Sequence, residues 1–218
     1  AAVSDVHIVY VGETHDNPAS HRIQLAVLEA MAERWPGQVS LGMEMFTRNQ
    51  QPVLDRWVSG DIRPQEFETI FHDNWGYAWP AYQPIFEYAR AARIPMIGLN
   101  VPREITRQVA RGGFQSLSDD QRGQLAEVAC QIDEEYMRYI RSVYGAHAHG
   151  NMNFTFFCEA QMVWDNAMAV HALEFLAAHP ETTMVILTGA GHAQIGAVPR
   201  QIRLRSSLPV TVFLPEVP

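Results

Sequence analysis

The stretch IVYV at residues 8–11 constrains the fold of this chain more than any other. A β-branched and aromatic run of this length is typical of a strand that is buried on both faces of a parallel sheet. Pro18 soon begins a helical pattern, with Asn17 in the position of an N-cap. The sequence therefore predicts a buried strand followed by a helix. Between the two, where open α/β sheets bind ligands, lie the polar residues Glu13, His15 and Asp16.

Three further apolar runs repeat this pattern, at residues 39–45, 95–100 and 183–187. The first two carry Glu44 and Asn100 at their ends, and the third is followed by TGAGH, which ends in His192. Because the carboxyl ends of parallel strands meet at one edge of a sheet, we expect these side chains to converge. The predicted edge cluster comprises Glu13, His15, Asp16, Glu44, Asn100 and His192.

Helical patterns alternate with these runs, which predicts an α/β fold with a mainly parallel sheet of about five strands flanked by helices. Residues 209–214 supply the last strand. With 47% hydrophobic residues, the 218-residue chain can bury a sizeable core, and we expect a single domain over residues 1–218. Residues 101–182 are almost entirely helical by pattern, so we expect them to form a helical subdomain inserted before the fourth strand.

Residues 154–178 within that tract form a helical pattern that is apolar almost all round, which is typical of a buried central helix. His171 lies in the middle of it, and we interpret it as a core histidine. Its expected hydrogen-bond partners are Gln161, Asp165 and Asn166. Residues 72–84 form an aromatic-rich stretch, which is either a loop packed over the sheet edge or one wall of a ligand pocket.

Composition excludes several classes of function. A net charge of −8 argues against general nucleic-acid binding, which needs a basic face. No apolar run is long enough to span a membrane, and residues 1–10 show no export signal. The HExxH, GxSxG and P-loop motifs are absent, so the common hydrolase and phosphate-binding signatures do not apply.

The edge cluster suits three kinds of role. His15 and His192 with Glu13 and Glu44 would suit a divalent metal ion, since imidazole and carboxylate are good ligands for such ions. The same four groups would suit general acid–base chemistry, in which a carboxylate orients an imidazole. The third possibility is structural, with the groups satisfying one another and nearby backbone.

A second candidate site lies in the segment HAHGNM, which follows a predicted helix. His147 and His149 are two residues apart, so both imidazoles could reach one ligand, although two exposed loop histidines are the simpler interpretation. Tyr144 lies one turn earlier on the flank of that helix, and a phenolate there could bind haem iron. Arg138 and Arg141 are candidates for pairing with haem propionates.

Five motifs in order resemble the ChaN family of haem-binding, iron-regulated lipoproteins of bacterial haem uptake. They are GETHDNP, LGMEMF, IPMIGLN, EAQMVWD and LTGAGHAQIGAVP, and the resemblance runs from about residue 8 to residue 199. The resemblance implies an α/β core and haem held at the interface of a homodimer. It also implies an axial tyrosine with histidine support, for which Tyr144 with His147 or His149 is the expected set.

The resemblance further implies a periplasmic or outer-membrane-anchored lipoprotein that works with haem-uptake machinery and binds haem rather than catalysing a reaction. The lipid-bearing cysteine of such a lipoprotein is not in the sequence. The same superfamily contains erythromycin esterases and Tiki metalloproteases, which share the Gly-Glu-x-His and Gly-His elements. It therefore keeps a hydrolase as the alternative, with Glu13, His15, Glu44 and His192 as its catalytic residues.

Overall fold

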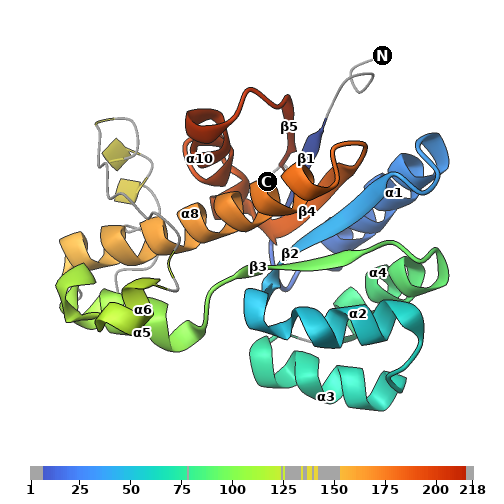
Figure 1. Ribbon diagram of the computed structural model, residues 1–218, viewed down its shortest axis with the longest axis horizontal. Helices are drawn as coiled ribbons and strands as arrows, with labels where there is room; N and C mark the ends of the chain where they lie inside the picture. The colour runs from blue at the N-terminus through green and yellow to red at the C-terminus, as the bar shows by residue number, and fades with distance from the viewer. Residues whose placement is uncertain are drawn as a thin grey trace.

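The computed structural model describes residues 7–77, 79–123, 125, 134, 137–138, 140–141 and 153–214. Its centre is a five-stranded sheet in which every strand pairing is parallel and the strand order is β3-β2-β4-β1-β5 (Figure 1). This confirms the predicted α/β fold with a parallel sheet flanked by helices. The strands are β1 (Ile8–Glu13), β2 (Val39–Thr47), β3 (Met96–Asn100), β4 (Thr183–Gly189) and β5 (Val210–Phe213).

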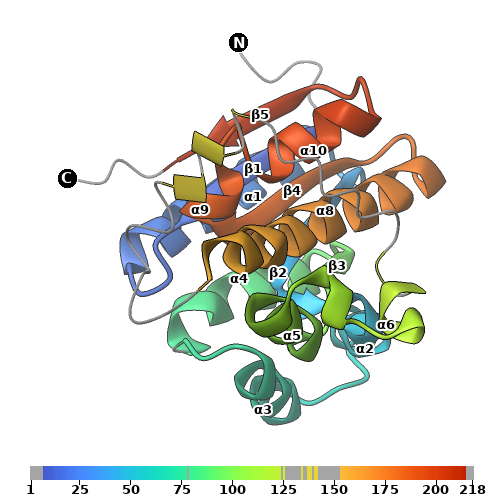
Figure 2. The same cartoon turned by 90° about the vertical axis from the view of Figure 1, so that its left-hand side faces the viewer.

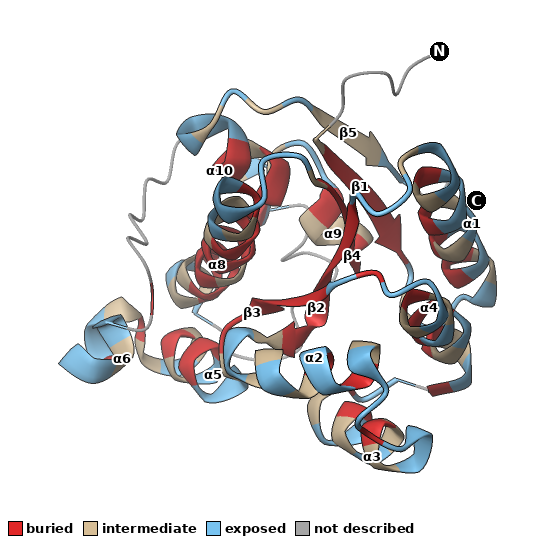
Figure 3. Cartoon of the chain, turned by 45° about the vertical axis from the view of Figure 1, so that its right-hand side comes forward, coloured by how far each residue is buried: buried red, intermediate tan, exposed pale blue. Residues whose placement is uncertain are grey.

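Helices cover both faces of the sheet, which is why its central strands are apolar on both sides. Four helices pack on one face: α1 (Pro18–Arg34), α2 (Gln51–Ser59), α3 (Pro64–Asn74) and α4 (Trp79–Ala91). The other face is covered by α8 (Phe154–Ala178) and α10 (Val198–Arg205), which lie side by side in Figures 1 and 2. Figure 3 shows the inner strands buried along their length, whereas β5 at the edge is only partly buried.

Alternate residues of β1 face the two layers, as the period of a strand requires. Val9 and Val11 pack against α1 and its neighbours, whereas Ile8 and Tyr10 pack against α8 and α10. The predicted cap is present, since the Asn17 side chain accepts a hydrogen bond from the Ala19 amide at 2.9 Å at the start of α1. Local sequence signals and packing thus agree along the first βα unit.

Helix α8 begins and ends where its apolar pattern does, at residues 154 and 178. Its second half packs on β3 and β4, and its first half packs on α5 (Arg103–Gly112). The short elements between strands are η1 (Arg48–Gln50), η2 (Phe114–Ser116), α6 (Asp119–Gly123) and α9 (Ala190–Ala193). The description of residues 101–182 as an inserted subdomain stays a prediction. No helix of the described residues is long and apolar enough to cross a membrane.

The connections after β1 and β4 decide where a ligand site can form. These strands are neighbours, but the chain after β1 continues into α1 on one face, and the chain after β4 continues through α9 into α10 on the other. Loops that leave adjacent parallel strands toward opposite faces open a crevice between the strand ends, which is the usual ligand site of open α/β sheets.

Candidate functional site

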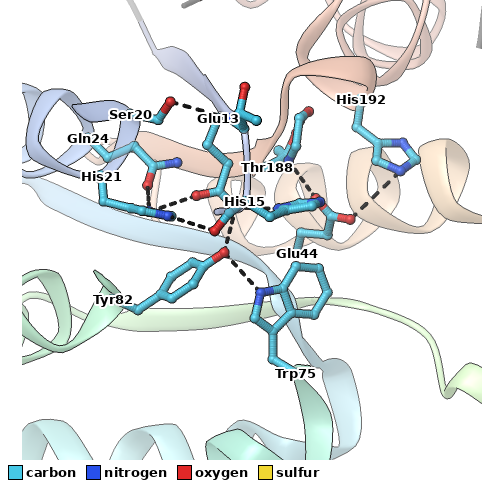
Figure 4. Close-up of polar contacts among 12 residues, drawn as sticks. Glu13, His15, Ser20, His21, Gln24, Glu44, Trp75, Tyr82, Thr188 and His192 are labelled. Carbon is cyan, nitrogen blue, oxygen red and sulfur yellow. Dashed lines mark hydrogen bonds and ion pairs between the residues drawn. The ribbon is translucent and has the colours of Figure 1, made fainter. Parts of the chain in front are cut away.

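Side chains from three strands and both helical layers meet at this crevice (Figure 4). Glu13 ends β1, Glu44 lies near the end of β2, and His192 follows β4 in the short helix α9. His15 lies in the turn between β1 and α1. The predicted convergence of Glu13, His15, Glu44 and His192 is therefore observed.

Glu13 is the most heavily bonded member of the site. Its side chain is buried, yet its oxygens contact His15 Nδ1 at 2.7 Å, His21 Nδ1 at 2.8 Å and the Tyr82 hydroxyl at 2.8 Å. Burial by itself would raise the pKa of the carboxyl, but the hydrogen bonds and positive charge of His15 and His21 lower the pKa of Glu13 to about 2. Glu13 is therefore an anion at any physiological pH.

The Glu13 carboxylate favours the protonated form of the two histidines beside it. Burial disfavours the imidazolium form of each ring, but the Glu13 carboxylate outweighs this and raises the pKa of both His15 and His21. His15 must carry its proton on Nδ1, because its partner is an ionised acceptor. His21 Nε2 also faces a backbone oxygen, that of His15 at 3.1 Å, so the protonated form of the ring would have acceptors at both nitrogens.

Aromatic side chains from residues 72–84 surround Glu13 and His15. Trp75 donates its indole N–H to the Tyr82 hydroxyl at 3.0 Å, and Tyr82 in turn donates to Glu13. The rings of Trp75 and Tyr77 pack against His15 with centroids 5.1 and 4.5 Å away. The stretch is therefore partly a pocket wall and partly helix α4, which begins at Trp79 and buries Tyr82.

Glu44 lies between His15 and His192. Its Oε2 accepts the backbone N–H of Gly189 at 2.7 Å, and its Oε1 lies 3.7 Å from His192 Nε2. His15 approaches from the other side, over Gly189: a Cβ at position 189 would lie 2.9 Å from His15 Cε1. Only a glycine at position 189 leaves room for the His15 ring in this place.

His192 is held by a carboxylate of its own, which comes from the helix on the opposite face. Asp165 in α8 is fully buried, and its Oδ1 lies 2.7 Å from His192 Nδ1. Burial favours the neutral imidazole, but the charge of Glu44 and the hydrogen bond and charge of Asp165 raise the pKa of His192 to about 9. His192 is therefore a cation near neutral pH, with Nδ1 directed at Asp165 and Nε2 facing Glu44.

Two predicted members of the cluster have other roles. Asn100 supports the backbone, because its amide donates to the Glu44 carbonyl at 3.0 Å and its oxygen accepts the Val101 N–H. Asp16 is exposed, and its side chain bonds to no other residue that the structure describes. The expected pairing of Asp165 with His171 is wrong: His171 Nδ1 bonds to the Leu99 carbonyl at 2.7 Å, because α8 packs on β3 at that level.

Sequence reasoning missed His21 and Tyr82 and misassigned Asp165. For His21 a signal exists, since Ser20, His21 and Gln24 stand at helical spacing with the buried Leu28. A helix whose sheet-facing side is polar in its first turns indicates a polar partner at the strand end. No comparable signal points to Tyr82, which looks like one more aromatic residue in an aromatic stretch.

The metal-ion interpretation gains no support. Within the described ranges, no group of three or more His, Cys, Asp or Glu side chains is arranged to hold a metal ion. The ring nitrogens and carboxylate oxygens are instead directed at one another or at backbone N–H groups. What the arrangement offers is a carboxylate flanked by two oriented histidines, one of them a proton donor near neutral pH.

The second candidate site falls mostly outside the described residues, as do Tyr144, His147 and His149. Arg141 is described and exposed. Its neighbour Ile140 is fully buried against Phe157, Cys158 and Met162, so the chain enters this segment along the first half of α8.

Solved structures share the fold. ChaN of Campylobacter jejuni, in a structure described as cofacial haem binding, superimposes with a TM-score of 0.75 at 18% identity, over 98% of this chain and 84% of that one. A mutant erythromycin esterase in its open conformation gives a TM-score of 0.57 at 14% identity, over 96% of this chain and 70% of that one. At these identities the likeness shows the fold alone.

A curated relative is the chloroplastic protein RETICULATA-RELATED 5 of Arabidopsis thaliana, which is 23% identical over 212 residues. The match covers 88% of this chain but only 28% of that protein. Residues 1–202 also match a protein family described as haem-binding uptake, Tiki superfamily, ChaN. Because that match covers most of the sequence, the chain belongs to the ChaN family of the Tiki superfamily.

Proposed function

We propose that this protein binds haem in a haem-uptake role. Membership of a family described as haem-binding, over residues 1–202, is the observation that carries the proposal. The shared fold with Campylobacter jejuni ChaN, whose structure is described as cofacial haem binding, supports it. We further propose that the protein acts outside the cytoplasm, in the periplasm or anchored to the outer membrane.

The side chains proposed for the haem site fit a haem chemically. Tyr144 offers a phenolate for the iron, and His147 or His149 offers a hydrogen bond to it or to a propionate. Arg141 is exposed and makes no ion pair with the other described residues, so its guanidinium is available to a propionate. Partly buried apolar side chains, Met137 and Phe154, lie on either side of the segment and would contact a flat apolar ring.

Haemin titration followed by absorbance tests this proposal. We expect a saturable Soret change in the natural protein, and a loss of the tyrosinate-type spectrum in Tyr144→Phe. Tyr88→Phe is the matched control, because Tyr88 is a residue of α4 and packs in the layer of α1 to α4, whereas Ile140 packs on α8. No saturable change would contradict haem binding, and a spectrum unaltered in Tyr144→Phe would contradict the choice of ligand.

Haem is larger than one loop can cover, so we propose that a second copy of the chain completes the pocket. Tyr144 and the nearby histidines would then lie close to the two-fold axis of a homodimer. The physiological partner that delivers or receives the haem would be a component of the uptake machinery.

A second candidate function, acid–base hydrolysis, is favoured by one specific observation at the sheet edge. Two histidines, each oriented by a buried carboxylate at 2.7 Å, flank the Glu44 carboxylate. In such an arrangement protonated His192 would donate a proton to a leaving group, and Glu44 with His15 would orient and deprotonate an attacking water. The fold shared with an erythromycin esterase is consistent with it.

An ester and peptide substrate panel, run on protein free of haem, tests this second candidate. If it is correct, His192→Gln and Asp165→Asn should each reduce turnover by at least 100-fold, the typical value of a positioned acid–base group. His72→Gln is the control, because His72 is an exposed residue of α3. Turnover that persists in His192→Gln, or no turnover in the natural protein, would exclude this function.

A further inference from the structure

A cavity of about 450 Å³ opens beside Glu44, at the side of the crevice that faces α5. Its size is that of a site for a small organic molecule. Its walls come from β2, the end of α3, the start of α5 and the middle of α8, including Trp75, Arg103, Arg107 and Trp164. We propose that it binds the carboxylate of an organic acid through Arg103, Arg107 and the Trp164 indole, at a site separate from the haem ligands proposed above.

The two arginines are the main cations of this cavity. They stand four residues apart in the first turns of α5, so their side chains project from the same side of the helix. Both are exposed, and neither guanidinium forms a hydrogen bond or an ion pair with any residue that the structure describes. Two free guanidinium groups on one wall match the planar, two-oxygen geometry of a carboxylate.

Trp164 adds a third donor. Its indole N–H is buried, and it has no hydrogen-bond partner among the described residues. A buried donor without a partner carries a free-energy cost that a ligand acceptor would remove. The Trp164 ring also packs edge-on against His192, with centroids 5.6 Å apart, so this side chain adjoins the histidine cluster.

The cavity and the histidine cluster are in direct contact. Glu44 lines the cavity and also faces His192, and Arg103 is close enough to Tyr77 for its charge to act on the Tyr77 hydroxyl. The Tyr77 ring in turn packs on His15. A ligand whose carboxylate lies at the arginines would therefore place its other end beside Glu44 and the two histidines.

Two acidic residues, Asp73 and Glu104, also line the cavity. Neither forms an ion pair with Arg103 or Arg107, so the guanidinium groups remain open to a ligand within the described structure. With Glu44 the lining holds three carboxylates against two guanidinium groups, so binding would rest on directional hydrogen bonds rather than on a net positive field. The cavity should therefore distinguish a carboxylate from a neutral molecule of the same shape.

Benzoate titration of ¹⁵N-labelled protein, followed by the indole N–H resonances, tests the proposal. Trp164→Phe identifies the Trp164 signal, and the signals of the remaining tryptophans report whether each variant is folded. We expect a saturable shift of the Trp164 signal, and at least tenfold weaker binding of benzamide, the neutral analogue. Arg103→Gln and Arg107→Gln should each weaken benzoate binding about tenfold or more, as expected for loss of a charge-assisted hydrogen bond.

Arg111→Gln is the matched control, because Arg111 lies one turn further along α5 and does not line the cavity. A Trp164 signal that does not move would overturn the proposal. So would benzamide that binds as tightly as benzoate, or benzoate that binds Arg103→Gln and Arg107→Gln as tightly as it binds the natural protein. Haem binding is measured separately by its Soret band, so the carboxylate proposal and the haem proposal can each fail independently.

The carboxylate could come from a small acid or from a haem propionate. Gallium protoporphyrin IX, which is diamagnetic, and its dimethyl ester distinguish these sources. If a propionate occupies the cavity, the free porphyrin shifts the Trp164 signal and competes with benzoate, whereas the ester does neither. If a small acid is the ligand, the porphyrin binds elsewhere and leaves the Trp164 signal unchanged.

Discussion

At the scale of single residues, three buried or half-buried histidines are each held by a carboxylate. Glu13 holds His15 and His21, and Asp165 holds His192. Burying a lone carboxylate is costly, and a paired imidazolium offsets that cost. The consequence is a set of groups whose pKa values are shifted in opposite directions, down for Glu13 and up for the histidines.

Replacing Glu13 by glutamine should destabilise the protein strongly. The change leaves His15 and His21 without their anion in a buried place, and removing one partner of such a set costs about 3 kcal/mol or more. Urea unfolding at neutral pH measures the free energy of unfolding. Glu29→Gln, at an exposed position of α1, is the control, and a loss in Glu13→Gln no larger than in this control would contradict the assignment.

The pKa of His192 predicts how stability depends on pH. In the unfolded chain a histidine titrates near ~6.5, whereas folded His192 titrates at about 9. The stabilisation is therefore complete below about pH 6.5 and is lost as the pH rises through 9, because over that range the folded state holds the proton longer than the unfolded state.

We expect the free energy of unfolding to fall by about 3 kcal/mol between pH 6.5 and 9.5, since one pKa unit corresponds to about 1.4 kcal/mol. In His192→Gln this part of the decline should be absent. Urea unfolding across that range, on both proteins, gives the comparison. If the free energy of unfolding falls equally with pH in both proteins, His192 is not the cause of the decline.

At the scale of elements, the turn from β4 into α9 brings His192 to Glu44 and His15. Its Gly189 donates to Glu44 and lies under the His15 ring, and His192 follows three residues later. Helix α8 then supplies Asp165 from the opposite layer. The cluster therefore depends on the close packing of β4 against β1 and of α8 against β4.

Gly189→Ala should displace His15 without unfolding the protein. The added Cβ would lie 2.9 Å from His15 Cε1, so the ring must move off Glu13 and its pKa should fall toward ~6.5. Overpacking of this kind costs about 1–3 kcal/mol. An NMR titration of the His15 ring protons measures the pKa. Gly76→Ala, where a Cβ meets open space, is the control, and an unchanged His15 pKa in Gly189→Ala would refute the close contact.

At the scale of the whole molecule, the site lies where the connections of β1 and β4 part toward opposite faces. Both helical layers therefore contribute to one crevice: α1 and α4 supply His21 and Tyr82, and α8 supplies Asp165 and Trp164. The proposed haem segment follows residue 141, whose neighbour Ile140 packs on the first half of α8. The described residue Ile140 thus contacts the same helix that supplies Asp165 and Trp164 to the crevice.

Haemin should promote dimerisation if a second chain completes the haem pocket. Sedimentation velocity with and without haemin should then show about twice the mass of one chain when haemin is bound. Tyr144→Phe should reduce this change, whereas Tyr88→Phe should not. Tight haem binding with the mass of a single chain would show that the ligand lies wholly within one subunit.

The sequence by itself determined the class of fold, the extent of α8 and the edge at which the polar groups meet. These follow from the hydrophobic period and from the order of strands and helices along the chain. A strand buried on both faces is apolar throughout, and the carboxyl ends of parallel strands meet at one edge of the sheet. The sequence was less informative at the start of α1, where Ile23 stands at helical spacing with Val27, Leu28 and Met31 and yet is 48% exposed. There the helix faces the polar strand end, so its buried side carries His21 and Gln24.

Only the tertiary structure decided which histidine pairs with which carboxylate. Asp165 lies six residues from His171 in the same helix but bonds to His192, 27 residues away, because α8 turns Asp165 toward the end of β4 and His171 toward β3. Periodicity assigns a residue to a face of its own element, whereas hydrogen bonds depend on distances between elements. The same holds for the cavity at Arg103, Arg107 and Trp164, since its walls come from elements that only packing brings together.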